Sequence, residues 1–272
     1  MDRVLFGRTL RAQRSKVVLV VAALLVWGAL MPLVYAELID TALGAEFRKL
    51  IDSGLVPSQL TQFGGGNIFT LPGAVALGLI HPIAVALVCV FAVGFAAAAV
   101  AGERQRGTLE VVFARPISRA AAYRTLFVAL LVFLGLAIVA ILAGTVVSAA
   151  AFGKLDQLQL ANVPLLGLNA LLLYTALGSV ALAASVSFDR LGPAVGIALA
   201  FTIVSYFFEI LGSLWDAAKQ LQPISVFHYL DPQSVLDGKA DPFAFAVLLA
   251  VTLAGAAWSL VVFPRRDLAA PA

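Results

Sequence analysis

Six long apolar stretches constrain this chain more than any other feature of its sequence. They span residues 17–36, 74–101, 125–149, 165–186, 192–211 and 243–263. A bilayer core about 30 Å thick is crossed by about 20 apolar residues in a helix, since each residue rises about 1.5 Å. Hydrophobic residues make up 62% of the chain, more than one soluble core of this size would hold. We therefore predict an all-α membrane protein, a single domain over residues 1–272 with six transmembrane helices.

The second stretch contains a break at His81-Pro82. Proline removes a helical donor and clashes with the preceding turn, so we expect a kink or a re-entrant beginning there. Three stretches also contain small residues at four-residue spacing, which predicts close approach of helix backbones. These sets are Gly94, Ala98 and Gly102; Ala140, Gly144 and Ser148; and Thr175, Ser179 and Ala183.

Basic residues are unevenly divided between the two ends of these spans. Thirteen of the 18 lysines and arginines lie in residues 1–16, in 102–124, at Arg190 or in the tail after 263. Cytoplasmic loops retain basic residues, so we expect both termini in the cytoplasm. An alternative interpretation of the first stretch is a cleaved signal peptide, because its basic leader and apolar run end at the small-residue pattern Val34-Tyr35-Ala36.

Several kinds of chemistry have no support in the sequence. The pairs Gly153-Lys154 and Gly238-Lys239 lack both the upstream glycine and the following Ser or Thr of a phosphate-binding loop, so we expect no ATP site in this chain. A single cysteine, Cys89, excludes an internal disulfide, and two histidines are too few for a histidine-rich metal site. The basic residues lie at span ends rather than along one face, which argues against a nucleic-acid partner.

Glu209 is an acidic residue inside a predicted span. Acids in membranes are costly and often functional, so Glu209 is interpreted as a substrate or proton contact, as a brace against another helix, or as a group that faces water. Tyr206, Phe208 and His228 join it as candidate residues of a substrate path or gate. An intramembrane enzyme that uses His81, Glu209 or His228 is the alternative class of function.

Two long segments are predicted on the external side. Residues 37–73 form a loop that starts with a helix-like pattern and ends in Gly64-Gly65-Gly66. Residues 212–242 mix apolar residues with Pro223, Asp231-Pro232 and Asp237-Gly238, which is typical of short re-entrant or interfacial helices. A simple loop with aromatic anchors at the interface is the alternative for this second segment.

Residues 102–124 contain five arginines between two apolar stretches and predict a contact with a soluble partner. Gly107 is expected to end one helix, Thr108 to cap a short second helix, and Pro116 to stop it. Ser118 is expected to cap the next span. The short helix would carry an apolar ridge of Leu109, Val112 and Phe113 that suits a groove on the partner, with a helix on lipid headgroups as the alternative.

These residues resemble a known family. Gly102-Glu103-Arg104, Gly107-Thr108-Leu109-Glu110 and Arg115-Pro116-Ile117-Ser118-Arg119 are similar to the signature of permease subunits of ATP-binding-cassette transporters of the type-2 exporter family. The resemblance extends to three further motifs. These are His81-Pro82, Pro223-Ile224-Ser225-Val226-Phe227-His228-Tyr229, and Phe263-Pro264-Arg265-Arg266-Asp267.

The resemblance implies a permease that pairs with a second copy as a homodimer and docks two copies of a separate ATPase subunit. ATP and Mg would bind to the ATPase, with no cofactor on this chain. Residues 1–16 would form an interfacial N-terminal helix, and the protein would lie in the bacterial inner membrane. The residues implied in docking are Glu103, Arg104, Gly107, Thr108, Leu109, Glu110, Val112, Phe113, Arg115, Pro116 and Arg119. The cargo stays open between amphipathic or lipid-like molecules and a role in metalloenzyme maturation.

Overall fold

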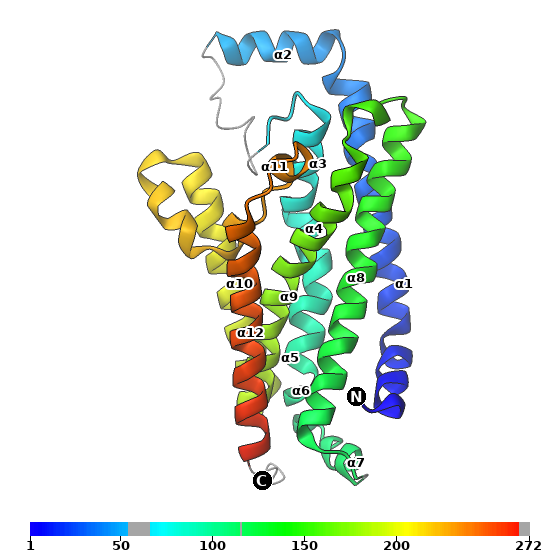
Figure 1. Cartoon of the computed structure of the whole chain (residues 1–272), viewed down its shortest axis with the longest axis vertical. Coiled ribbons are helices and arrows are strands. Elements are labelled where there is room, and N and C mark those ends of the chain that lie inside the picture. The colour runs from blue at the N-terminus through cyan, green and yellow to red at the C-terminus, as the bar shows by residue number, and fades with distance from the viewer. Residues whose placement is uncertain (54–65, 115, 267–272) are drawn as a thin grey trace.

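The computed structural model describes residues 1–53, 66–114 and 116–266, which form a bundle of long helices (Figure 1). Five helices are long and apolar enough to cross a membrane, and a pair bent by 47°, at residues 71–80 and 82–98, supplies a sixth candidate span. The long helices are α1 (Arg3–Val34), α8 (Arg119–Ala151), α9 (Val163–Ser187), α10 (Leu191–Leu214) and α12 (Pro242–Arg265). This confirms the all-helical class for the described residues, and the six predicted spans are matched by five helices, or by six if the bent pair is one span.

The first helix, α1, continues without interruption from the basic N-terminal segment into the first span. Asp2 caps it by accepting a hydrogen bond from the Leu5 amide at 2.7 Å, and the Asp2 amide donates to Thr125 of α8 at 2.8 Å. Its 32 residues extend about 48 Å, well beyond the hydrocarbon core. Residues 3–16 are thus helical, as expected, but they are one piece with the span rather than a separate helix. A π-helical turn, η1 (Tyr35–Ile39), follows α1.

Helices α1 and α8 pack backbone against backbone. A Cβ added to Gly28 would lie 2.0 Å from the carbonyl oxygen of Ile141, and one added to Gly144 would lie 2.1 Å from that of Leu25. The hydroxyl of Ser148 also donates to the carbonyl of Ala29 at 2.7 Å. The Ala140, Gly144 and Ser148 stripe is therefore buried against α1, as small-residue spacing predicts.

The expected break at His81-Pro82 separates α3 (Leu71–Ile80) from α4 (Pro82–Cys89). Pro82 has no N–H to donate to the carbonyl of Gly78, and the indole of Trp27 donates to that oxygen instead, at 2.9 Å. The Tyr206 hydroxyl of α10 likewise donates to the carbonyl of Ile80 at 2.8 Å. His81 Nδ1 accepts from the Ile83 amide at 3.3 Å, so this imidazole caps α4.

Helix α9 lies in the centre of the bundle and packs on α12. A Cβ on Gly255 of α12 would lie 2.7 Å from the hydroxyl of Ser179, so these two backbones also approach closely. In contrast, Gly94 of the remaining stripe is exposed, and Ala98 is only partly buried. That first stripe is therefore not a helix–helix contact along its length, unlike the Ala140, Gly144 and Ser148 stripe.

At one end of the bundle, α2 (Ala42–Asp52) lies across the helix ends (Figure 1). Lys154, in the short link between α8 and α9, pairs with Asp40 at 2.6 Å and ties the two connections together. That link contains the 3₁₀ turns η5 (Leu155–Gln157) and η6 (Leu160–Asn162). Gly64 and Gly65 of the predicted 37–73 loop lie outside the described residues.

The segment 212–242 folds into short helical pieces at the same end. They are η7 (Asp216–Ile224), η8 (Val226–Tyr229) and α11 (Pro232–Leu236). Asn169 of α9 donates to the carbonyl of Tyr229 at 3.0 Å, and Asn162 donates to that of Leu236 at 3.0 Å. The prediction of short helices is met, but two of the three are 3₁₀ helices rather than α-helices.

Candidate functional site

The charged segment 102–124 lies at the opposite end, beside the start of α1 and the end of α12 (Figure 1). It follows a second irregularity in the second span, which the sequence did not reveal. After α4 the chain forms a π-helix, η4 (Val90–Phe95), then α5 (Ala96–Ala98), and resumes as α6 (Ala101–Gln105). At Val100 the backbone turns away from regular helical geometry, with φ −117° and ψ −54°.

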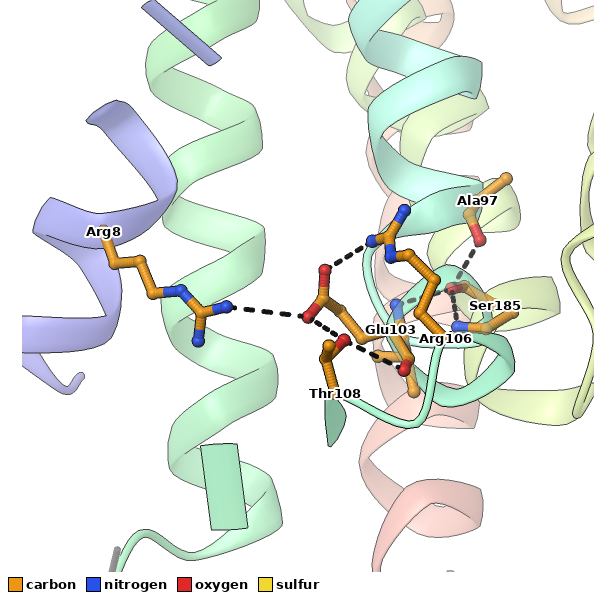
Figure 2. Close-up of polar contacts among 8 residues, drawn as sticks. Arg8, Ala97, Glu103, Arg106, Thr108 and Ser185 are labelled. Carbon is orange, nitrogen blue, oxygen red and sulfur yellow. Dashed lines mark hydrogen bonds and ion pairs between the residues drawn. The ribbon is translucent and has the colours of Figure 1, made fainter. Parts of the chain in front are cut away.

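Ser185 of α9 satisfies the backbone groups at this break (Figure 2). Its hydroxyl oxygen accepts from the amides of Val100 and Ala101, each at 3.0 Å, and its proton goes to the carbonyl of Ala97 at 2.7 Å. The Ser185 side chain is fully buried. One side chain thus bridges the two halves of the broken helix, because a buried amide without a partner would be costly.

Glu103, one turn later, is the centre of a polar cluster (Figure 2). One carboxylate oxygen pairs with Arg106, and the other accepts from the Thr108 hydroxyl at 2.7 Å. The second oxygen also lies 3.9 Å from the Arg8 guanidinium of α1. Glu103 therefore holds the turn between α6 and the short helix α7 (Leu109–Phe113), and links that turn to the first helix.

Thr108 occupies the predicted position but makes a different bond. It precedes α7 without capping it through its side chain, since the hydroxyl donates to Glu103 rather than accepting from an α7 amide. Gly107 does end the preceding helix, with φ +69°, in the left-handed region that favours glycine. Ser118 caps α8 as expected, by accepting from the Ala121 amide at 3.2 Å. Arg115 lies outside the described residues, and Pro116 is exposed.

The apolar ridge of α7 faces the protein's own bundle. Leu109 is 6% exposed, and the ring of Phe113 packs edge-on against Phe263 of α12 with centroids 6.0 Å apart. Val112 is partly buried on the same side. The opposite side presents Glu110 and Val111, of which Val111 is 64% exposed. The surface open to a partner is thus the reverse of the one expected from periodicity.

A second charged group joins the segment to the other helices at this end. Arg104 pairs with Asp189, in the turn between α9 and α10, at 2.9 Å, and Asp189 also binds Arg266 at 2.7 Å. Arg119 donates to the carbonyls of Phe263 and Pro264, which are at the end of α12, at 3.2 and 3.0 Å. The positive charge of Arg119 is favourable there, because the C-terminal end of a helix such as α12 carries partial negative charge. The segment is thereby attached to α9, α10 and α12 as well as α1.

The candidate path or gate residues lie at the far end. Gln222 of η7 donates to the Glu209 carboxylate at 3.1 Å, and His228 Nδ1 lies 3.6 Å from that carboxylate. The nearby Glu209 carboxylate raises the pKa of His228 above its ordinary value. Because its side chain is 15% exposed and bonded to Gln222, Glu209 braces α10 against η7 and η8.

Tyr206 and Phe208 are not part of that brace. Tyr206 packs against Phe227 with ring centroids 5.1 Å apart and bonds to Ile80, whereas Phe208 is half-buried beside Phe207. The structure therefore brings Glu209 and His228 together and leaves Phe208 apart. Ser185, Asp189 and Arg8 were missed in the sequence. Of these, Asp189 and Arg8 had a visible signal in their charge, but a serine in an apolar stretch has none.

Comparison of the sequence with known proteins identifies one family. No curated protein and no solved structure showed a significant match. Residues 10–268 match the model of the ABC-2 family transporter proteins, so the chain belongs to this family of membrane transport proteins as a permease subunit of the ABC-2 type.

Proposed function

We propose that this protein is the membrane-spanning subunit of an ATP-driven exporter, that it works as a homodimer, and that two separate ATPase subunits bind its 102–124 segment. Membership of the ABC-2 family implies association with ABC ATPases. ATP and Mg would then reside on those partners. The observation that supports docking at this segment is the exposed face of α7, whose flanking residues Glu103, Arg104 and Arg119 contact α1, the α9–α10 turn and the end of α12.

The contacts of the segment explain how it would transmit force. A push on α7 reaches α1 through Glu103 and Arg8, the second span through Ser185, and the α9–α10 turn through Arg104 and Asp189. A ligand shifts a conformational equilibrium only through different contacts in the two states. Nucleotide-driven closure of the ATPases would supply that difference at α7, and the bonded network would distribute it to the spans.

The proposal includes an orientation and a cargo class. The basic residues concentrated at the α7 end favour the cytoplasmic side for that end and for both termini. The proposed location is the bacterial inner membrane. Export would then move cargo from the cytoplasmic side, where the ATPases bind, to the opposite side. The few charges within the spans favour an amphipathic or lipid-like cargo over an ion.

The docking surface is tested by a charge on the exposed side of α7. Val111→Asp should abolish co-purification of the ATPase while the permease remains folded, because Val111 makes little contact within its own chain. Leu160→Asp is the matched control, since Leu160 is 44% exposed in η6 at the other end of the bundle. Leu109→Asp should instead destabilise the permease, because Leu109 is buried.

The readout is capture of the ATPase on the tagged permease, together with ATP hydrolysis in liposomes. Hydrophobic compounds added to these liposomes would identify the cargo by their stimulation of hydrolysis. An ATPase that still binds the Val111→Asp variant as well as it binds the Leu160→Asp variant would refute docking on this face.

A further inference from the structure

A cavity of about 200 Å³ lies between the N-terminal part of α1 on one side and the second span and α7 on the other. Its walls come from α1, from residues 94–100, from α6 and α7, and from the facing sides of α8 and α12. Phe95, Leu109 and Phe113 give it apolar surface, and the exposed Gly94 and the partly buried Ala98 of the first small-residue stripe lie along it. The space that this stripe leaves open is therefore a cavity between helices.

The cavity is lined by an excess of positive charge. Arg8, Lys16 and Arg106 contribute three cationic side chains, and Glu103 contributes one carboxylate. The Arg8 guanidinium is 3.9 Å from Glu103, too far for a hydrogen bond, and is half-exposed. Within the described ranges, Lys16 has no ion pair. The cavity thus offers positive charge and free N–H donors to an anion.

Its depth relative to the membrane favours a particular kind of anion. Lys16 is the last residue before the apolar stretch that begins at Val17, so the cavity lies where the first span reaches the headgroup layer. Basic pockets between transmembrane helices at this level bind anionic lipid headgroups. The apolar walls next to the cations suit an amphiphile better than a fully hydrated ion.

The volume restricts what enters. The cavity has a volume of about 200 Å³. Pockets that enclose a drug-sized ligand have volumes of about 300–1,000 Å³. A headgroup therefore fits and a whole lipid does not, which leaves the acyl chains in the bilayer.

Gln13 adds a polar group with an unmet bonding capacity. Its amide lines the cavity, and its buried side-chain oxygen has no hydrogen-bond partner among the described residues. A buried acceptor without a donor is costly, so a hydroxyl-bearing occupant would satisfy it. This favours a headgroup that combines a phosphate with hydroxyl groups.

We propose that this cavity binds the headgroup of an anionic phospholipid from the adjacent leaflet, with the phosphate held by Arg8, Lys16 and Arg106. Gln13 bonds a headgroup hydroxyl. The occupant contacts α1 and, through Arg106, the turn before α7, so the lipid joins the first helix to the 102–124 segment. Binding requires no ATPase, so its test is separate from that of the transport proposal.

The test measures lipid retention by the purified, delipidated full chain in detergent. Native mass spectrometry would follow the binding of phosphatidylglycerol, with phosphatidylcholine as the zwitterionic comparison that has no net charge. The double variant R8Q/K16Q should lose affinity for phosphatidylglycerol by about tenfold to thirtyfold, the effect of two basic groups near a lipid phosphate. Inorganic phosphate and glycerol 3-phosphate are tested as competitors to identify the source of the anion.

The matched control is R11Q/R14Q, which removes the same charge from exposed positions of α1 that do not line the cavity. Its affinity should stay within about twofold of that of the unchanged protein. An equal loss in both double variants would show nonspecific attraction and overturn the site. Phosphate or glycerol 3-phosphate binding as tightly as the lipid would overturn the lipid as occupant. Melting curves check that both variants are folded.

Discussion

Replacement of Ser185 by alanine is the sharpest test of how the second span is held together. The substitution deletes one oxygen, and with it two accepted bonds from Val100 and Ala101 and one donated bond to Ala97. Alanine otherwise fits the space, so the change isolates these three bonds. The residue is fully buried between helices, and we expect no compensating contact from another protein group.

Two estimates bound the cost. If each orphaned amide costs about 1–3 kcal/mol, the two amides together cost up to about 6 kcal/mol. Bonds between helices in membrane proteins average about 0.6 kcal/mol, so three of them give about 2 kcal/mol. Val100 also lines the cavity beside α1, where water can reach the broken backbone. We therefore expect a loss close to 2 kcal/mol in the free energy of unfolding.

The assay is unfolding in mixed micelles, with hydrogen exchange of the backbone amides as a local readout. Thr202→Val is the matched control, because it also removes a buried hydroxyl, one that donates to Ala198 in its own helix. In Ser185→Ala, exchange at Val100 and Ala101 and across α6 should accelerate, whereas the control should leave it unchanged. Equal stability of the two variants, with no change in exchange, would refute the bridging role of Ser185.

Two further predictions concern other contacts. Gly28→Ala should destabilise the protein by about 1–3 kcal/mol, because the added Cβ would lie 2.0 Å from the carbonyl oxygen of Ile141. The control Gly135→Ala in α8, where the added Cβ meets nothing within 4 Å, should be neutral or stabilising. Unfolding in mixed micelles compares the two variants, and equal effects would contradict the close packing of α1 on α8. Because the pKa of His228 is raised in the folded protein, its pairing with Glu209 stabilises the fold below the ordinary histidine pKa, and this stabilisation is lost as the pH rises through the raised pKa. The melting temperature should therefore depend less on pH in Glu209→Gln than in the unchanged protein. An unchanged profile would count against the pair.

The sequence predicted the spans because their signal is a run of apolar residues of sufficient length. It also predicted the break at His81-Pro82, since proline alters the backbone wherever it occurs. The break at Val100 has no such signal, as neither Ala99 nor Val100 disfavours a helix strongly. That break depends on a serine 85 residues away, which only the folded arrangement brings near.

The direction of the α7 ridge illustrates a different limit. Periodicity places Leu109, Val112 and Phe113 on one side of the helix, and the structure agrees. It does not say whether another protein or the chain itself covers that side. Here Phe263 of α12 covers it, so the docking face had to be assigned from exposure.

The two breaks in the second span have a common consequence for movement. At the first, Trp27 and Tyr206 bond the freed carbonyls of Gly78 and Ile80, and at the second, Ser185 bonds the backbone around Val100. At both breaks, side chains of α1, α10 and α9 thus form the hydrogen bonds that the backbone of this span lacks. Displacing any piece of it either moves those helices or exposes unpaired polar groups in an apolar surrounding. A displacement that starts at α7 is therefore expected to move α9 together with the second span.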